Sequence, residues 1–159
     1  MRVKAVAVVL AVCACALGVA MGSSVRRAAS PRSAVARGEY LVNAVAGCGH
    51  CHTPRKGEEL DKSRWMAGGT EFKSKAGTIY SANLTPDRET GRGKWTEKQF
   101  VRAMREGVTP EGGKLMAPMP RYDRITDRDL HAMWAYLRSL KPIRNKVPER
   151  QPAQGQAGK

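Results

Sequence analysis

The chain has 159 residues and a formal net charge of +14, from 28 Lys and Arg against 14 Asp and Glu. This length predicts one folded domain, and the excess of positive charge favours acidic protein partners or the headgroups of an anionic membrane surface. Nucleic acid is the competing partner for a basic chain. The sequence contains no nucleic-acid-binding motif, however, and the export signal described next also argues against it.

Residues 1–22 are typical of an export signal. Arg2 and Lys4 precede an uninterrupted run of apolar residues and glycine, and small residues follow it. The run is at the short edge of the ~20 residues that cross a membrane, so an uncleaved N-terminal anchor is the alternative. We therefore expect a periplasmic protein, either free or tethered to the inner membrane by this segment. Residues 23–33 are basic and Ser-rich, without apolar periodicity, and predict a mobile linker.

The folded domain is expected to span residues 34–145 and to begin with a helix over residues 35–46. Tyr40, Leu41, Ala44 and Val45 fall on one helical face, and Gly47 ends the pattern.

The next six residues, 47–52, contain the chain's most informative motif, in which Cys48, Cys51 and His52 form C-x-x-C-H. This is the attachment signature of c-type haem. On a helical turn, both thiols lie on one face, where each can form a thioether to one haem vinyl group. His52 can then bind the iron from one side. Because the cofactor carries the redox event, the motif predicts electron transfer rather than group chemistry.

Two other interpretations of the motif are a dithiol redox site and half of a zinc site. A dithiol motif of the thioredoxin type would need a βαβ context, whereas a helical pattern precedes this one. Zinc needs about four ligands, and a count alone does not exclude it. Export also favours haem, because Cys13 and Cys15 lie inside the signal and haem attachment uses both remaining thiols.

Residues 54–94 are rich in glycine and show no helical pattern. A stretch of this length without regular structure is unusual in a compact domain, and a haem edge that the loop must wrap is one physical reason for it. No segment of the chain alternates with period two, so we predict an all-α domain. The C-x-x-C-H motif occurs once, which predicts one haem.

Two further helices are expected over residues 96–107 and 126–142. Thr96 and Gln99 fit a capping box, and Thr126 with Asp129 gives an acidic variant of it. After residue 145, the chain contains Pro, Gln and Gly with little apolar surface, so we predict a disordered tail over residues 146–159.

The second axial ligand of the iron is expected to be a methionine thioether, as in electron-carrier cytochromes. Met119 lies between Pro118 and Pro120, which restrict its backbone and favour it as a ligand. Met116 is the alternative. Met104 and Met133 lie on helical apolar stripes and are expected to pack in the core, whereas Met66 fits either role.

These residues resemble class I cytochrome c domains, in particular those of cytochrome c subunits of bacterial alcohol, gluconate and N-heterocycle dehydrogenases. The resemblance spans about residues 37–142. It is carried by the segments 37–41, 47–53, 68–69, 77–87, 90–96, 119–120, 129–130 and 135–137.

The resemblance implies a cytochrome c fold, with three main helices and long loops around one covalent haem. It implies that Met119 is the axial ligand, that Gly38 lets the first helix cross closely against the third near Tyr136, and that a loop lines the haem edge and propionates. From that loop, the candidate haem neighbours are Tyr80, Asn83 and Trp95. Family members commonly carry three haem domains and a C-terminal membrane helix. This chain contains the haem-attachment motif once, so it is expected to be a single-haem relative of that family.

The function expected from these features is a single-haem electron carrier that exchanges single electrons between periplasmic or membrane redox partners. A cytochrome subunit of a specific membrane-associated dehydrogenase is the alternative. A haem enzyme such as a peroxidase is less consistent, because it needs an open iron face that a Met-ligated iron lacks. We therefore expect an electron carrier rather than an enzyme.

Overall fold

The computed structural model describes residues 30–75 and 77–153. The predicted export segment and most of the predicted linker lie outside the described residues. Within the described part of the chain, no helix is long and apolar enough to cross a membrane.

The first helix, α1 (Pro31–Tyr40), begins before its predicted start at Val35. The Ser30 hydroxyl accepts a hydrogen bond from the Ser33 amide at 3.3 Å, and Pro31 occupies the first turn, where its missing N–H costs nothing. The helix continues into a π-helical segment, Leu41–Val45, and a short helix, α2 (Cys48–His52), follows. The first residues of α1 therefore belong to the segment that composition assigns to a linker.

Two further helices, α3 (Glu97–Glu106) and α4 (Asp127–Ser139), form where their capping residues predict them. The capping box of α3 is complete, because Thr96 and Gln99 exchange side-chain-to-backbone hydrogen bonds of 2.9 and 3.3 Å. At α4, the Thr126 hydroxyl accepts from the Asp129 amide at 3.2 Å. Both predicted N-termini are confirmed.

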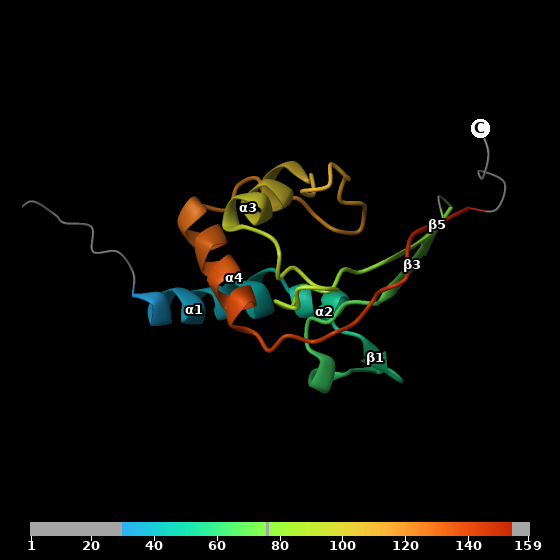
Figure 1. Cartoon of the computed structure of the whole chain (residues 1–159), viewed down its shortest axis with the longest axis horizontal. Helices are drawn as coiled ribbons and strands as arrows, with labels where there is room; N and C mark the ends of the chain where they lie inside the picture. The colour runs from blue at the N-terminus through green and yellow to red at the C-terminus, as the bar shows by residue number, and fades with distance from the viewer. Residues whose placement is uncertain (1–29, 76, 154–159) are drawn as a thin grey trace, which may run out of the picture.

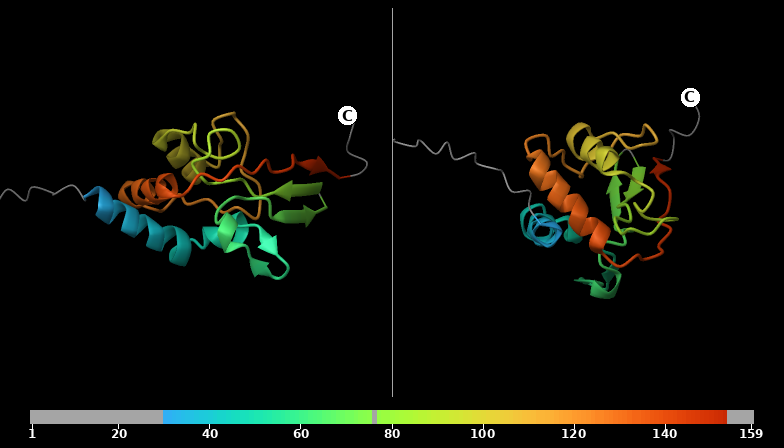
Figure 2. Two further views of the ribbon diagram at one scale, coloured as in Figure 1. Left: turned by 60° about the horizontal axis from the view of Figure 1, so that its bottom comes forward. Right: turned by 60° about the vertical axis from the view of Figure 1, so that its left-hand side comes forward.

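Helix α4 crosses α1 at close range, as Figures 1 and 2 show. A Cβ at Gly38 would collide with the Ala132 carbonyl and approach the Tyr136 Cβ at 2.8 Å, so the two backbones approach as closely as the resemblance implied. Helix α3 packs on the other side of α4 through Phe100 and Trp134, whose rings stack with centroids 5.4 Å apart. The core between these helices contains Leu41, Val42, Met66, Phe100, Met104, Leu130, Met133 and Leu137.

The prediction of an all-α domain is wrong, because the described residues also form two small antiparallel sheets. Strands β1 (Arg55–Lys56) and β2 (Glu59–Leu60) form a hairpin. Strands β3 (Glu71–Ser74) and β4 (Gly77–Tyr80) form a second hairpin, and β5 (Gln151–Pro152) pairs with the outer edge of β4. Strands of two to four residues are too short to show period-two alternation, so the sequence pattern could not reveal them.

The strand β5 lies within residues 146–159, which composition assigns to a disordered tail. Residues 146–153 instead run along the domain to the β3–β4 hairpin, and residues 154–159 lie outside the described residues. Figures 1 and 2 show the resulting arrangement, in which α1, α3 and α4 gather at one end of the molecule and the sheet of β3, β4 and β5 lies at the other. Helix α2 lies between them.

Candidate functional site

Helix α2 presents the two cysteines and His52 within little more than one turn. Gly47 precedes the helix with φ +60°, a conformation that glycine adopts without steric cost. Within the helix, a Cβ at Gly49 would collide with the indole of Trp65, so the helix packs directly against that ring. Gly47 thus allows the sharp change of chain direction before the helix, and Gly49 allows the helix to pack closely against Trp65 in the loop that follows.

The Cys48 and Cys51 thiols are free in the structure, Cys48 partly buried and Cys51 exposed. Burial raises the pKa of the Cys48 thiol to about 11, so this sulfur is protonated at neutral pH. A redox dithiol instead relies on a lowered thiol pKa. Within the described residues, no group of three or more His, Cys, Asp and Glu side chains is placed to hold a metal ion. The raised pKa of the Cys48 thiol argues against the dithiol interpretation of the motif.

His52 is buried, and its Nδ1 lies 2.8 Å from the Ala82 carbonyl oxygen. Because a carbonyl only accepts, Nδ1 donates the hydrogen, and Nε2 keeps a free lone pair. Burial also lowers the pKa of the imidazole, which favours the neutral form. A neutral imidazole whose other nitrogen is held by a carbonyl is the usual arrangement of a metal-binding histidine.

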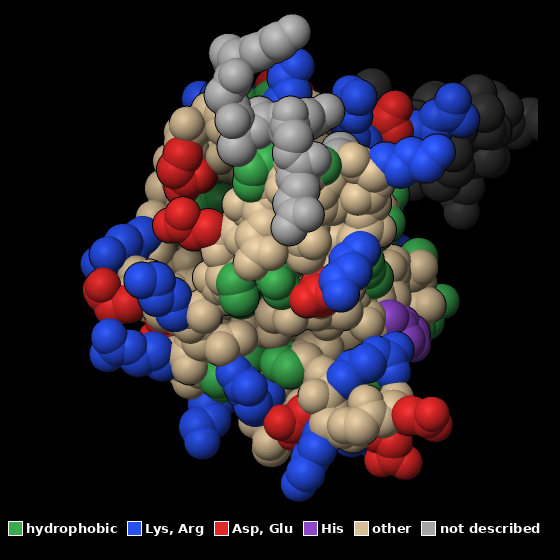
Figure 3. Space-filling view, turned by 90° about the vertical axis from the view of Figure 1, so that its right-hand side faces the viewer, with side chains coloured by type: hydrophobic (Ala, Val, Ile, Leu, Met, Phe, Trp, Pro, Cys, Tyr) green, Lys and Arg blue, Asp and Glu red, His purple; other side chains and the backbone are tan. Residues whose placement is uncertain are grey.

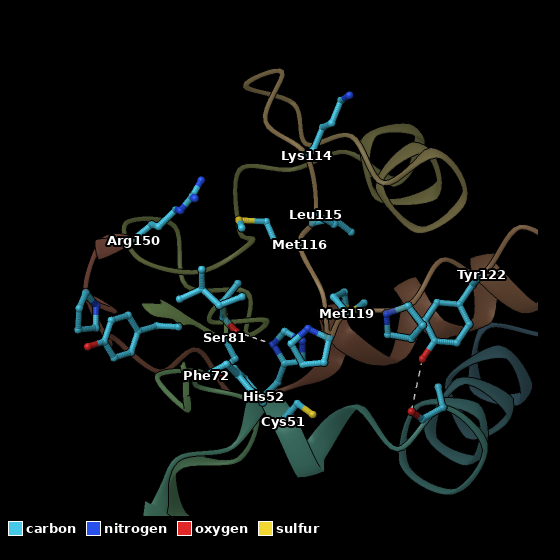
Figure 4. Close-up of a pocket in the computed structure, with 17 residues that line it drawn as sticks. Cys51, His52, Phe72, Ser81, Lys114, Leu115, Met116, Met119, Tyr122 and Arg150 are labelled. Atoms are coloured by element: carbon cyan, nitrogen blue, oxygen red, sulfur yellow. Dashed lines mark hydrogen bonds between the residues drawn. The ribbon is translucent and has the colours of Figure 1, made fainter. Parts of the chain in front are cut away.

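A cavity of about 330 Å³ opens beside His52, and we call it the pocket. Its volume lies at the lower end of the ~300–1,000 Å³ that small-molecule and cofactor sites occupy. Figure 4 shows His52 and Cys51 on one side of the pocket, with Leu115, Met116 and Met119 across from them. The lining residues are Ala46, Cys51, His52, Phe72, Ile79, Tyr80, Ser81, Ala82, Lys114, Leu115, Met116, Pro118, Met119, Pro120, Tyr122, Pro148 and Arg150.

Met119 lies on a segment that hydrogen bonds hold on both sides. The Leu115 amide donates to the Gly107 carbonyl at 2.8 Å, and the Tyr122 amide donates to the Met104 carbonyl at 2.8 Å. Met119 is partly buried and packs against the core. Met119 lines the same pocket as His52, so an imidazole and a thioether share this cavity (Figure 4).

The other methionines occupy different environments. Met116 also lines the pocket and is 36% exposed, so the geometry keeps it as the alternative. Met66, Met104 and Met133 are buried in the hydrophobic core and are not among the described residues that line the pocket. Met66, for which the sequence left two roles open, therefore packs in the core.

The three residues expected around the haem lie in different places. Tyr80 lines the pocket, and its hydroxyl donates to a Glu71 carboxylate oxygen at 3.3 Å. Asn83 and Trp95 are not among the described lining residues. Asn83 is buried behind Ala82, where it donates to the Ile143 carbonyl at 2.8 Å. Trp95 packs under the Arg92 guanidinium, whose carbon lies 4.5 Å from the centre of the ring.

Several pocket residues escaped the sequence reasoning. Phe72 and Ile79 belong to the β3–β4 hairpin, which no alternating pattern revealed, and Pro148 and Arg150 belong to the supposedly disordered tail. Lys114 precedes Leu115 and Met116 in the chain, and nothing in the sequence except its charge marked it as a pocket residue. All of these residues contribute to the pocket wall.

The side chains present fit a covalently bound haem. Two thiols lie on one helical turn, a neutral imidazole has its Nε2 free, a thioether lies across the pocket, and the remaining walls are mostly apolar. The sequence of residues 35–141 also matches the family model described as Cytochrome c.

The chain belongs to the cytochrome c family. Haem c, with its iron, is the cofactor of this family.

The curated relatives of this cytochrome c domain include cytochrome subunits of bacterial dehydrogenases. It is 38% identical over 120 residues to the cytochrome c subunit of a quinone alcohol dehydrogenase from Gluconobacter oxydans, covering 72% of this chain and 24% of the relative. It is 37% identical over 127 residues to the fructose dehydrogenase cytochrome subunit from Gluconobacter japonicus, covering 78% and 25%. It is 38% identical over 112 residues to the gluconate 2-dehydrogenase cytochrome c subunit from Pantoea cypripedii, covering 69% and 24%. The chain thus spans about a quarter of the length of each of these relatives.

Proposed function

We propose that this cytochrome c domain carries one covalent haem c and passes single electrons between redox proteins. Cys48 and Cys51 would form the thioethers, and His52 and Met119 would be the two axial ligands. The observation that carries the proposal is the position of His52 and Met119 across one pocket, with a pocket-lining cysteine beside the histidine.

The protein's own groups would set the properties of this centre, while the haem supplies a one-electron couple. The Ala82 carbonyl holds the His52 ring through the 2.8 Å hydrogen bond and so fixes its tautomer. The hydrogen-bonded segment around Met119 holds a weak ligand in place. Phe72, Ile79 and Leu115 give the same space apolar walls.

We further propose that the redox partners dock through acidic surfaces, and that one of them is a dehydrogenase. The net charge of +14 favours acidic partners, and the names of the relatives support the dehydrogenase.

Figure 3 shows the end of the molecule that carries the β3–β4–β5 sheet. Hydrophobic side chains gather near the middle of this face, and Lys and Arg side chains project around its margin, with some Asp and Glu among them. We place the protein in the periplasm on the basis of the predicted export signal, with attachment to the inner membrane as the alternative.

The proposal is tested by expressing the full chain in a host that matures c-type cytochromes. We expect covalent haem in a one-to-one ratio, by mass spectrometry and by the pyridine haemochrome spectrum. Loss of covalent haem when Cys48 and Cys51 are replaced by Ala is the accompanying control. A wild-type chain without covalent haem would refute the proposal.

The axial ligand is tested with Met119→Ala. This variant should lose the sulfur-to-iron charge-transfer band at the red end of the oxidised spectrum and should have a lower reduction potential, because the thioether favours reduced iron. Met116→Ala is the matched control, since Met116 lines the same pocket. If Met116→Ala loses the band and Met119→Ala keeps it, the assignment moves to Met116.

A further inference from the structure

Asn145 lies on the segment that follows α4 and is bonded to two loops far from it in the sequence. Figures 1 and 2 show this segment leaving α4 and running toward the sheet of β3, β4 and β5. The Asn145 side chain donates from Nδ2 to the Ala67 carbonyl at 2.8 Å and to the Gly68 carbonyl at 3.3 Å. The Asn145 backbone N–H donates to the Thr90 hydroxyl oxygen at 2.8 Å. These hydrogen bonds fix the start of the C-terminal segment to the domain.

The two carbonyls that the Asn145 side chain holds belong to buried residues. Ala67 has no exposed surface, and Gly68 is buried as well. A buried carbonyl that loses its donor is destabilised, because water does not replace the lost hydrogen bond. Without the Asn145 amide, the backbone at Ala67 and Gly68 would therefore lose a restraint on its position.

The Gly68 backbone in turn supports His52 in two ways. The Gly68 amide donates to the His52 carbonyl at 2.7 Å. A Cβ at Gly68 would collide with the Ala82 carbonyl group and come within 2.6 Å of its oxygen, so the two backbones are in direct contact. That same Ala82 oxygen accepts the hydrogen bond from His52 Nδ1 at 2.8 Å. Gly68 thus contacts both the main chain of His52 and the carbonyl that holds its ring.

The segment after α4 also holds the other side of the Ala82 carbonyl. Asn83, the next residue in the chain, donates from Nδ2 to the Ile143 carbonyl at 2.8 Å. Residues 143–145 are therefore bonded to the backbone on both sides of this carbonyl, directly at Asn83 and through the contact of Gly68. This arrangement restrains the oxygen that accepts from the His52 ring.

The hydrogen bond from His52 Nδ1 affects the iron that Nε2 would bind. A carbonyl that accepts from Nδ1 makes the imidazole a more basic ligand, so it donates more electron density to the metal. A stronger donor stabilises oxidised iron more than reduced iron, because the oxidised form carries one more positive charge. Holding the Ala82 carbonyl against the ring therefore lowers the reduction potential, and releasing it raises the potential.

We propose that Asn145 is a positioning residue for His52, and that its side-chain amide tunes the reduction potential by holding the Gly68 backbone against the Ala82 carbonyl. This inference rests on the haem c site proposed above. Asn145 is not among the described residues that line the pocket. Its effect on the iron therefore passes through the backbone of Gly68 and Ala82 to the His52 hydrogen bond.

The test compares Asn145→Ala with Asn43→Ala in the full haem-loaded chain. Asn43 is the matched control, because its side chain also donates within the domain, to the Tyr136 hydroxyl at 3.0 Å, and does not belong to the described pocket lining. NMR of the reduced, diamagnetic protein follows the His52 Nδ1 proton. In Asn145→Ala, this proton should exchange with solvent several-fold faster and shift upfield, because its hydrogen bond to Ala82 is weaker. In Asn43→Ala, both properties should match the wild type.

The reduction potential is the second measurement, and its sign separates positioning from a general loosening of the structure. By spectroelectrochemistry, Asn145→Ala should have a higher potential than the wild type, whereas Asn43→Ala should not. A loosened pocket that admits water would instead lower the potential, because water stabilises the more highly charged oxidised haem. A lowered or unchanged potential in Asn145→Ala, or an unchanged His52 proton, would overturn the proposal. An equal rise in Asn43→Ala would overturn it too.

Asn145→Ser is the milder variant, for the case that Asn145→Ala does not retain haem. Its hydroxyl is shorter than the amide and provides one hydrogen in place of two, so the potential should rise and the His52 proton should exchange faster here as well. If both stay at their wild-type values in Asn145→Ser, the proposal is overturned.

The outcomes distinguish this inference from the proposed function. Covalent haem in the wild type with an unchanged potential in the Asn145 variants would overturn the inference and leave the haem c site standing. A wild-type chain without covalent haem would refute the proposed function itself.

Discussion

Asn83 illustrates how a single side chain outside the pocket can support the group inside it. Its Oδ1 accepts from the Thr85 amide at 3.0 Å and from the Thr85 hydroxyl at 2.7 Å. Its Nδ2 donates to the Ile143 carbonyl at 2.8 Å. The residue before it, Ala82, provides the carbonyl that holds His52. Asn83 therefore connects the backbone whose Ala82 carbonyl holds His52 to the chain at Ile143, which follows α4.

Replacing Asn83 by Ala should lower the free energy of unfolding by about 2 kcal/mol, because buried partners would lose their hydrogen bonds. The measurement is urea unfolding of the haem-loaded protein. Ser63→Ala is the control, since that serine is exposed and bonded only to Asp61 in the described structure, and its effect should stay within about 0.5 kcal/mol. If the two variants unfold at the same urea concentration, Asn83 does not have this supporting role.

Among the elements, the crossing of α1 and α4 depends on a position without a side chain. Gly38 faces the Ala132 carbonyl, and the adjacent Arg37 forms an ion pair with Asp129 at 3.0 Å. The Arg37 side chain of this ion pair is half exposed, so solvent screens the pair and it contributes little. The close backbone contact therefore determines how the two helices pack.

Gly38→Ala should destabilise the protein by about 2–3 kcal/mol, because the added methyl group forces the helices apart in a packed interface. Thermal or urea unfolding of the haem-loaded chain measures this. Gly113→Ala adds the same methyl group where, among the residues that the structure describes, the one atom within 4 Å is the Thr109 hydroxyl, at 3.3 Å. An equally small effect at both glycines would contradict the packing argument.

The sequence predicted the helices better than the strands. Helices α3 and α4 were predictable because capping residues and apolar spacing act locally, as Thr96 and Thr126 illustrate. The short strands were missed because their pairing depends on residues far apart, such as Thr78 and Gln151. At the site, Cys48, Cys51 and His52 were recognisable because they are adjacent in the sequence. Arg150, by contrast, is brought to the pocket by tertiary contacts of its segment, such as the hydrogen bonds of Asn83 and Asn145.

Over the whole molecule, positive charge is the dominant surface property, with a net value of +14. Charges of one sign speed the encounter with an acidic partner and lose this effect as salt screens them. The Debye length falls from about 30 Å at 0.01 M to about 8 Å at 0.15 M ionic strength.

Electron exchange with an acidic redox protein should therefore slow markedly as NaCl rises across this range. Stopped-flow kinetics at fixed protein concentrations measure the rate, and an uncharged small-molecule reductant is the control that should be insensitive to salt. Lys114→Gln should reduce the steepness of the salt dependence if the partner docks at the pocket margin. Rates independent of salt would contradict electrostatic docking.

The start of α1 and the sheet that borders the pocket lie toward opposite ends of the molecule, which matters when the protein is attached to a surface. Figure 1 shows the start of α1 at one end of the long axis and the β3–β4–β5 sheet, which borders the pocket, toward the other. A linkage placed just before Pro31 would leave the pocket facing outward. If the protein were attached to an electrode through that end, the pocket would face the solution. If it were attached through residues 146–153, the pocket would face the electrode.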